Sequence, residues 1–503
     1  MMYKSRVFYA KQNLLFGVIR QIVAVSAPFI TRTVMIKTLG AEYTGLDGVF
    51  KSILMIFNVA ELGFATAISF YLYTPLAVRD ASEVCKFVCY LNKIYKGIGI
   101  AISVCSFIML PFLEFLIRGG TPEDLNLYML FMLTVSYNVA GYLLFAYKEV
   151  LVVAAQRQDI VSKIDIVIIA FQMIAQSASL LLLNDYYLFL LIQVVSVLGR
   201  NLLIGHVADK LFPQYLRKNN LPKEKKDAIY EHIKGIIIGR LTSLSRNGFD
   251  VIFISALCGL HYVTIYQNYY YVYAAICSLM GVVTKSIIAS VGDSIARENK
   301  DKNYVDYQNL DFLYWIVRVV IAVILVLTYQ LFMDLWVGKE LMFDDRVMVL
   351  FVIYFYIVTA GGIRSAYIAG SGIWGKLQRI NLMECLSNIV LNYMLGVYWG
   401  IMGIIIASIL TVLIFSIYGN SIVLIKEYFR TEMSVYFYEL TKQNFIGLSF
   451  VLLAWWASYV WGASYDWKIM IKIGLTILGC FVAILMLDSK YKRQVKWVRA
   501  IVR

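Results

Sequence analysis

The stretch Asn13–Leu39, which reads NLLFGVIRQIVAVSAPFITRTVMIKTL, decides the fold because its outline recurs 219 positions later in the chain. The counterpart is Lys234–Cys258, which reads KGIIIGRLTSLSRNGFDVIFISALC. Each segment holds roughly the 20 residues that an apolar helix needs to cross a bilayer. The sequence therefore predicts membrane-spanning helices that occur in two similar sets.

Five more apolar segments follow in each half, and the same shift relates them. The first-half segments are Leu46–Leu72, Leu91–Ile117, Leu125–Val150, Ile160–Leu183 and Tyr186–Asp209. Their partners are Tyr262–Ala289, Gln308–Met333, Arg346–Gly370, Ile380–Val397 and Ile401–Ile425. Six spans per half is an even number, so the two halves share one orientation in the membrane. Parallel repeats of this kind are typical of transporters in which the two halves move against each other.

Two further spans, Gln443–Ala463 and Lys468–Leu487, follow the second set. The predicted fold class is therefore an all-α membrane protein with about 14 transmembrane helices, in two six-helix lobes plus two C-terminal helices. We place the lobes at 1–209 and 234–425, a cytoplasmic linker at 210–233, and the last two helices with a basic tail at 426–503. Connections predicted to be very short, such as Asn184-Asp185 and Tyr398–Gly400, require antiparallel neighbours.

Few residues are identical between the halves at this shift. The matches include Gly40 with Gly259, Gly119 with Gly338, Tyr43 with Tyr262 and Asn201 with Asn420. Over about 200 compared positions, chance alone gives several matches, so the prediction of a repeat rests on the spacing of the spans.

The composition excludes a soluble class, because 60% of the residues are hydrophobic and only 16% are charged. Soluble domains carry about 25% charged residues. The net charge of +14 follows the topology: we assign 32 of the 46 Lys and Arg to alternate loops and the termini, four to the opposite loops, and ten to apolar segments. By the positive-inside rule, both termini lie in the cytoplasm and the protein is a multi-pass protein of the inner (cytoplasmic) membrane. The basic charge therefore does not indicate a nucleic-acid partner.

Features that would indicate an enzyme or a bound cofactor are missing from the sequence. The seven cysteines and three histidines show no metal-ligand spacing, and no GxxxxGK[ST] phosphate loop occurs. Gly370–Lys376 contains a GxGxxG-like run, but it joins two predicted membrane helices and follows no strand. We therefore predict a protein that is not an enzyme and that carries neither a cofactor nor a metal.

The cations inside apolar segments are the strongest functional signal, because a Lys or Arg at mid-bilayer costs about 2.5–3.5 kcal/mol. Lys37, Arg318 and Lys472 are expected to reach an interface by snorkelling. Six others should face a wet cavity or a partner, and they form the predicted cationic substrate site: Arg20, Lys51, Arg200, Arg240, Arg246 and Arg364. Arg suits phosphate because its planar fork makes two-point contacts.

Polar side chains also fall on one face of several predicted helices, as expected around an aqueous pathway. Candidate sugar contacts are Asn247, Gln267, Tyr270, Tyr271 and Asn388, and candidate ion-coupling residues are Glu61, Asp165, Asp250 and Glu384. A purely structural role is an alternative for residues of each set. Arg246 and Asp250 are four residues apart and can neutralise one another. The tyrosines can face lipid, Asn388 can join two helices by a hydrogen bond, and Asp165 and Glu384 can be structural ion-pair partners.

Four segments resemble the polysaccharide flippases of the Wzx type, which belong to the multidrug/oligosaccharidyl-lipid/polysaccharide exporter superfamily. They are Leu39-Gly-Ala-Glu-Tyr-Thr-Gly-Leu46, Glu61-Leu-Gly-Phe-Ala-Thr-Ala67, Ala154-Ala-Gln-Arg-Gln-Asp159, and Asn392 followed by Gly400-Ile-Met-Gly403. The resemblance covers nearly the whole chain and implies a V-shaped pair of six-helix lobes that alternate access. It implies an undecaprenyl-pyrophosphate-linked oligosaccharide as substrate, for O-antigen or capsule synthesis, with a polysaccharide polymerase as a possible partner.

In this interpretation the pyrophosphate binds to Arg20, Arg240 and Arg246, while the lipid tail stays in the bilayer. An alternative is a cation-coupled multidrug exporter of the same superfamily, although exporters of cationic drugs favour anionic, aromatic cavities and this chain has surplus Arg. A membrane-embedded glycosyltransferase or polymerase would need a large external loop, and the predicted external loops are too short.

Overall fold

The computed structural model describes residues 6–58, 64–122, 125–215, 220–227, 229–230, 233, 245–461, 467–487, 491 and 494. No β-strand occurs among these residues, and helices make up nearly all of them. The chain forms two compact units, which we call the N-terminal unit (Met1–Thr264) and the C-terminal unit (Ile265–Arg503). The all-α membrane fold predicted from the sequence is confirmed.

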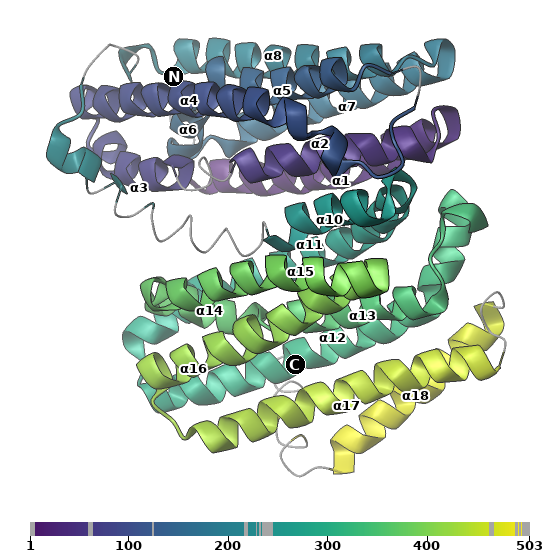
Figure 1. Ribbon diagram of the computed structural model, residues 1–503. Helices are drawn as coiled ribbons and strands as arrows, with labels where there is room; N and C mark the ends of the chain where they lie inside the picture. Colours follow the sequence, from purple (N-terminus) through teal and green to yellow (C-terminus); the bar gives the residue numbers. More distant parts are fainter. Residues whose placement is uncertain are drawn as a thin grey trace. The chain divides into compact units, whose positions relative to one another are not determined.

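The N-terminal unit contains most of the first-half helices in chain order (Figure 1). They are α1 (Arg6–Thr38), α2 (Ala41–Phe57), α3 (Phe64–Ala77), α4 (Ala81–Met109), α5 (Leu127–Leu143), α6 (Ala146–Ala154), α7 (Gln158–Leu183) and α8 (Tyr186–Leu211). Helix α1 packs along α7, while α8 packs against both α5 and α7. A π-helical turn (Ser245–Phe249), α10 (Asp250–Cys258) and the first turn of α11 (Leu260–Arg297) complete the unit.

The C-terminal unit is built around α12 (Lys300–Val337), which packs against α13, α14, α17 and α18. The other helices are α11 from Ile265 onward, α13 (Asp345–Thr359), α14 (Gly362–Ser371), α15 (Trp374–Thr411), α16 (Asn420–Leu424), α17 (Met433–Val460) and α18 (Trp467–Leu487). Large aromatic side chains fill its core, including fully buried Trp315, Tyr356 and Tyr367. The segments on either side of α16 are π-helical.

Nine of the described helical stretches are long and apolar enough to cross a membrane, and the bent pair α5–α6 gives a tenth. The longest stretch, Trp374–Phe429, contains two predicted spans, because the backbone reverses at Gly400 (φ 57°, ψ −132°). Gly403 is pressed against the carbonyl oxygen of Leu395 at this reversal, so only glycine fits there. The predicted short connection Tyr398–Gly400 is therefore confirmed. The other predicted spans correspond to α2 with α3, to α10, and to α17.

Two glycine pairs that the sequence comparison left at chance level have matching backbone conformations. Gly40 (φ 92°, ψ −177°) and Gly259 (φ 98°, ψ 172°) both precede a helix, α2 and α11 respectively. Gly119 (φ 88°) and Gly338 (φ 80°) form the second pair. These values lie in a region that is nearly restricted to glycine. The two halves of the chain thus share turn geometry as well as span spacing.

Contrary to the prediction from the sequence, the side chain of Arg318 does not lie at a membrane interface. Its side chain does not snorkel to an interface but is only 4% exposed in the core of the C-terminal unit. It donates to the Tyr356 hydroxyl at 3.3 Å and to Asn444 Oδ1 at 3.1 Å, and its guanidinium lies over the Tyr356 ring. Hydrogen bonds and ring contact thus stabilise a buried charge that the sequence placed at the surface. Lys37 and Lys472 are exposed, as snorkelling residues should be.

Candidate functional site: a tyrosine-lined cavity beside an ion-pair network

Four charged side chains from four helices form one network in the N-terminal unit. Asp165 on α7 accepts a hydrogen bond from Arg20 Nε on α1 at 2.5 Å and from Arg200 Nε on α8 at 2.7 Å. Arg200 Nη1 also donates to Glu149 Oε2 on α6 at 2.9 Å. Two guanidinium groups face two carboxylates, so the charges of the four residues cancel.

The members of this network differ in burial. Asp165 is only 3% exposed, and it lies between the two arginines. Glu149 is 29% exposed, and Arg200 is its one side-chain hydrogen-bond partner among the described residues. Removing a buried carboxylate leaves its cationic partners uncompensated. This geometry favours a structural role for Asp165, whereas Glu149 is the accessible end of the network.

A break in the fourth span positions Glu149. Helix α5 ends at Leu143, Phe145 has a left-handed conformation (φ 56°), and α6 restarts at an angle of 47°. Lys148 and Glu149 then both reach α8, since Lys148 Nζ lies 2.6 Å from Asp209 Oδ1. The ring of Phe145 packs against Gly205, where a Cβ would come within 3.1 Å of it.

The amide of Asn201 compensates for this break in the backbone. Carbonyl groups at the end of a helix have no partner within the helix. Asn201 Nδ2 donates to the carbonyl oxygens of Gly141 at 3.1 Å and Ala140 at 3.4 Å, both in the last turn of α5. A side chain on α8 thus satisfies the backbone of a neighbouring span at the point where that span bends.

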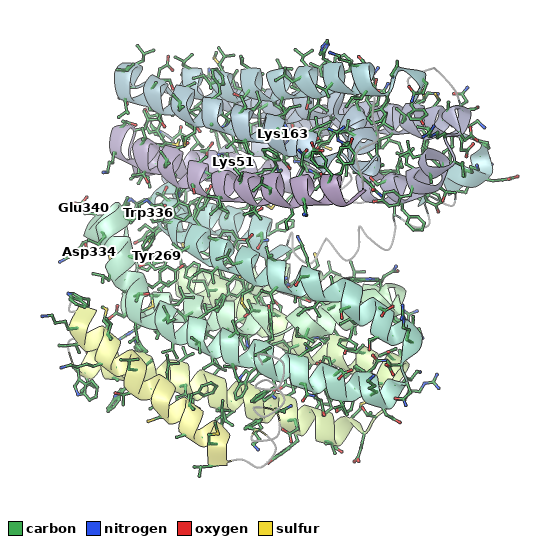
Figure 2. The ribbon with its side chains drawn as sticks, turned by 180° about the vertical axis from the view of Figure 1, so that it is seen from behind. Lys51, Lys163, Tyr269, Asp334, Trp336 and Glu340 are labelled. Carbon is green, nitrogen blue, oxygen red and sulfur yellow. The ribbon has the colours of Figure 1, made fainter. Side chains whose placement is uncertain are left out.

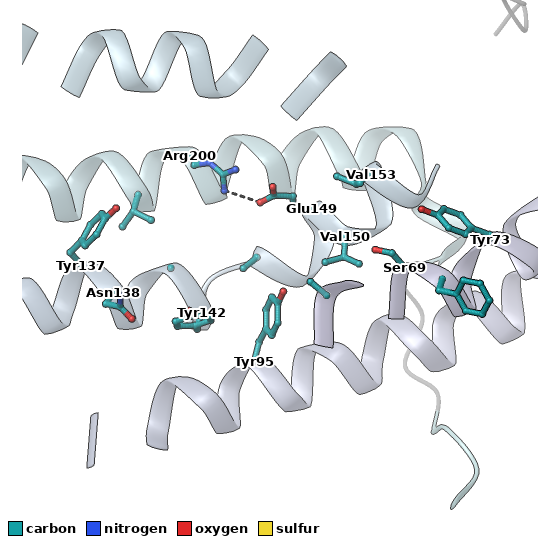
Figure 3. A pocket seen from close by; sticks show the side chains of 15 residues that line it. Ser69, Tyr73, Tyr95, Tyr137, Asn138, Tyr142, Glu149, Val150, Val153 and Arg200 are labelled. Carbon is teal, nitrogen blue, oxygen red and sulfur yellow. Dashed lines mark hydrogen bonds and ion pairs between the residues drawn. The ribbon is translucent and has the colours of Figure 1, made fainter. Parts of the chain in front are cut away.

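A cavity of about 690 Å³ opens beside the Arg200–Glu149 pair (Figure 3). Its polar and aromatic lining comes from α3, α4, α5, α6 and α8, and includes Ser69, Tyr73, Tyr95, Tyr137, Asn138, Tyr142, Glu149 and Arg200. The Tyr95 and Tyr142 rings meet edge to face at 5.9 Å, and the Tyr142 hydroxyl donates to Asn58 Oδ1 at 3.1 Å. Such a lining offers flat aromatic faces and hydrogen-bonding groups together.

The predicted site residues fall in both units. In the N-terminal unit, the structure brings Arg20, Asp165 and Arg200 together. Lys51, which is labelled in Figure 2, is separate from them. It pairs with Asp47 one turn away at 2.6 Å. Arg246 and Asn247 lie in the π-helical turn before α10, and buried Asp250 begins that helix. Arg240 and Glu61 lie outside the described residues.

The C-terminal unit holds the other predicted site residues, and several lie in its packed interior. Arg364 is 2% exposed and donates from Nη1 to Ser421 Oγ at 3.0 Å. Asn388 donates to Ser408 Oγ at 3.1 Å across the hairpin at Gly400, and Glu384 is buried one turn earlier. Gln267, Tyr270 and Tyr271 are half-buried on α11, where the Tyr270 ring stacks on Tyr266 at 6.2 Å.

Sequence reasoning missed Glu149 and the cavity tyrosines Tyr73, Tyr95, Tyr137 and Tyr142. Glu149 was detectable as an acidic residue inside the apolar segment Leu125–Val150. The tyrosines come from three separate helices, and no sequence pattern marks their convergence. No group of three or more His, Cys, Asp or Glu suited to a metal occurs in the part of the chain that the structure describes.

No protein-family model matches the chain, and no curated protein matches it in sequence. Solved structures do match. The lipid II flippase MurJ in an inward closed conformation aligns with a TM-score of 0.64 at 14% identity, over 97% of this chain and 100% of that one. An inward-facing multidrug resistance MATE family transporter of the MOP superfamily aligns at 0.57 and 13% identity, over 80% of this chain and 97% of that one.

A third similar structure is a MOP superfamily transporter from Pyrococcus furiosus, described as having a binding pocket of reverse polarity. It aligns with a TM-score of 0.53 at 13% identity, over 83% of this chain and 96% of that one. At these identities the likeness concerns the fold, which is a two-lobe fold of 12 to 14 helices. The chain therefore has the fold of the MOP superfamily transporters.

Proposed function

We propose that this protein is a flippase that moves undecaprenyl-pyrophosphate-linked oligosaccharides from the inner to the outer leaflet of the cytoplasmic membrane. The product would serve surface polysaccharide synthesis, such as O-antigen or capsule, with a polymerase acting afterwards. The observation that carries the proposal is the cavity of the N-terminal unit, where four tyrosines and Asn138 lie beside the Arg200 guanidinium. Sugar rings stack on aromatic faces, and a guanidinium binds phosphate.

The fold supports the same substrate class. The alignment with the lipid II flippase covers 97% of this chain, whereas that with the MATE transporter covers 80% of it. A lipid-linked substrate can keep its tail in the bilayer while its polar head enters a cavity. In this proposal Arg20, Arg240 and Arg246 also contact the pyrophosphate, and Glu61 is the candidate for ion coupling.

A multidrug exporter is the second candidate, and Glu149 is the observation that favours it. A carboxylate beside aromatic rings suits a cationic drug, because both groups attract positive charge. Since Glu149 pairs with Arg200 at 2.9 Å, its charge is already compensated in this structure. This pairing makes the drug exporter the weaker candidate.

The deciding experiment is deletion of the gene in its native strain, followed by analysis of lipid-linked intermediates. Under the proposal, complete undecaprenyl-pyrophosphate oligosaccharides accumulate on the cytoplasmic side and surface polysaccharide is lost. A complementary assay measures flipping of a fluorescent lipid-linked oligosaccharide in proteoliposomes. Normal intermediates in the deletion strain, together with increased drug sensitivity, would instead support the exporter.

A further inference from the structure

The Arg200 guanidinium is held so that part of it remains available to a ligand. Its Nε donates to buried Asp165, which fixes the orientation of the group. Its Nη1 donates to Glu149 and, at 3.5 Å, to Asn201 Oδ1, while Nη2 makes no hydrogen bond within the described residues. Arginine binds phosphate most strongly through two donors at once. In Arg200, Glu149 occupies one of the two nitrogens that such a contact would use.

Glu149 itself is held weakly compared with Asp165. Among the described residues it has a single hydrogen-bond partner, it is 29% exposed, and it lines the cavity together with Arg200 (Figure 3). Partly exposed ion pairs stabilise a structure by roughly 1 kcal/mol or less. An anion that enters the cavity can therefore displace the Glu149 carboxylate at small cost, whereas displacing Asp165 would leave two arginines without their shared partner.

We propose that Glu149 is a built-in competitor for the anionic head of the substrate, and that a diester pyrophosphate replaces its carboxylate on Arg200. This inference rests on the proposed function and adds the residue that sets the affinity and the charge selectivity of the cavity. With the Glu149 carboxylate on Arg200, the charges of the four-residue network cancel. With that carboxylate displaced or replaced by an amide, Arg200 presents an uncompensated positive charge to the ligand.

Among the described residues, no other cation close to Glu149 is placed to bind the anion instead of Arg200. Beyond Arg200 lie Asp165 and Arg20, and the adjacent Lys148 is already paired with Asp209. The remaining titratable groups at the cavity are hydroxyls, which belong to Tyr73, Tyr95, Tyr137 and Tyr142. Within the part of the chain that the structure describes, Arg200 is the one cation that lines this cavity.

The test measures binding of a soluble short-chain prenyl pyrophosphate glycoside to the purified full-length protein in phosphatidylcholine nanodiscs. Glu149→Gln should raise the affinity about tenfold, since it removes a charged competitor but keeps the shape of the side chain. Arg200→Gln should abolish binding. The matched control is Glu83→Gln, which neutralises another ion-paired carboxylate of the same unit, on α4 and outside the lining of the cavity, and should leave binding unchanged.

Equal affinity for the glycoside in the wild type and in Glu149→Gln would overturn the inference.

Two further outcomes separate this inference from others. If phosphatidylglycerol competes as well as the pyrophosphate glycoside, the site binds any lipid phosphate and the assignment to pyrophosphate is wrong. If binding is unaffected by Arg200→Gln, the cavity site itself is wrong. The deletion strain and the flipping assay test flippase activity itself independently of both outcomes.

Discussion

Gly45 on α2 lies directly against the carbonyl oxygen of Leu260, the first residue of α11, and any side chain at position 45 would collide with it. Close by, Thr264 Oγ1 donates to the carbonyl oxygen of Ala41 at 2.5 Å. The shift of 219 positions relates Ala41 to Leu260 and Gly45 to Thr264. The contact is therefore reciprocal, as in a two-fold interface where residue i meets j and j meets i.

Gly45→Val is expected to destabilise the protein by about 1–3 kcal/mol, the usual cost of forcing atoms into a packed contact. Because the neighbouring atom is backbone, it cannot swing away as a side chain would. Thermal unfolding in detergent measures the effect. Gly97→Val, in a helix where nothing lies within 4 Å of a built Cβ, is the matched control and should change little. Equal melting temperatures for the two variants would contradict this packing.

Replacing Arg318 by Met should lower stability by about 2–4 kcal/mol, because the Tyr356 hydroxyl and Asn444 Oδ1 would lose a buried donor. Lys472→Met, on the exposed face of α18, is the control and should be nearly neutral. The sequence predicts an interfacial position for both cations, so a difference between the two variants supports burial of Arg318. A neutral Arg318→Met would mean that this side chain is not buried.

Asp165→Asn should reduce stability by about 3–5 kcal/mol, since it leaves Arg20 and Arg200 without the carboxylate that they share. Asp209→Asn removes a carboxylate that is 51% exposed and paired with a single lysine, and should cost far less. Melting temperatures at neutral pH compare the two. If Asp165→Asn is as stable as the wild type but loses dependence on the pH gradient in a flipping assay, Asp165 is a coupling residue and not a structural anchor.

Cysteine labelling in intact cells tests the predicted orientation. In a variant with all seven native cysteines replaced by serine, single cysteines at exposed Lys223 and Lys300 should be protected from an impermeant thiol reagent. A cysteine at exposed Asp344, in the opposite loop before α13, should be labelled. The expectation follows from the unequal distribution of Lys and Arg among the loops. Labelling at Lys223 without permeabilisation would reverse the orientation.

The sequence predicted the helices well, because each depends on a local run of apolar residues. The reversals at Asn184 and Gly400 were also readable, since they lie where apolar runs meet. The cavity was not readable. Helical angles place Asp165 and Arg200 on the polar faces of their own helices, but they do not say which faces meet. The sequence therefore predicts that Arg200 faces the substrate site, whereas the structure shows it in ion pairs with Asp165 and Glu149.

Arg318 is a second example of a side chain whose surroundings could not be predicted from its own helix. Its position along α12 gave no sign that Tyr356 and Asn444, from helices far along the chain, would surround it. Conversely, the identity of Gly40 and Gly259 is stronger evidence for the repeat than a chance match would be. Both glycines adopt the same backbone conformation, which a comparison of sequences does not take into account. The division of the chain into lobes remains a prediction from the repeat.

The bend after Leu143 has a consequence for how the cavity is encoded. In hydrocarbon, a span that breaks must find new partners for its freed carbonyl groups. Here the partner is the amide of Asn201, which belongs to another helix. The cavity beside Tyr142 and Glu149 thus depends on two separate parts of the sequence. One is the span that bends, and the other is the Asn201 amide that satisfies the carbonyl groups freed by the bend. A change from Asn to Leu at 201 would alter the shape of a chamber whose wall it does not form.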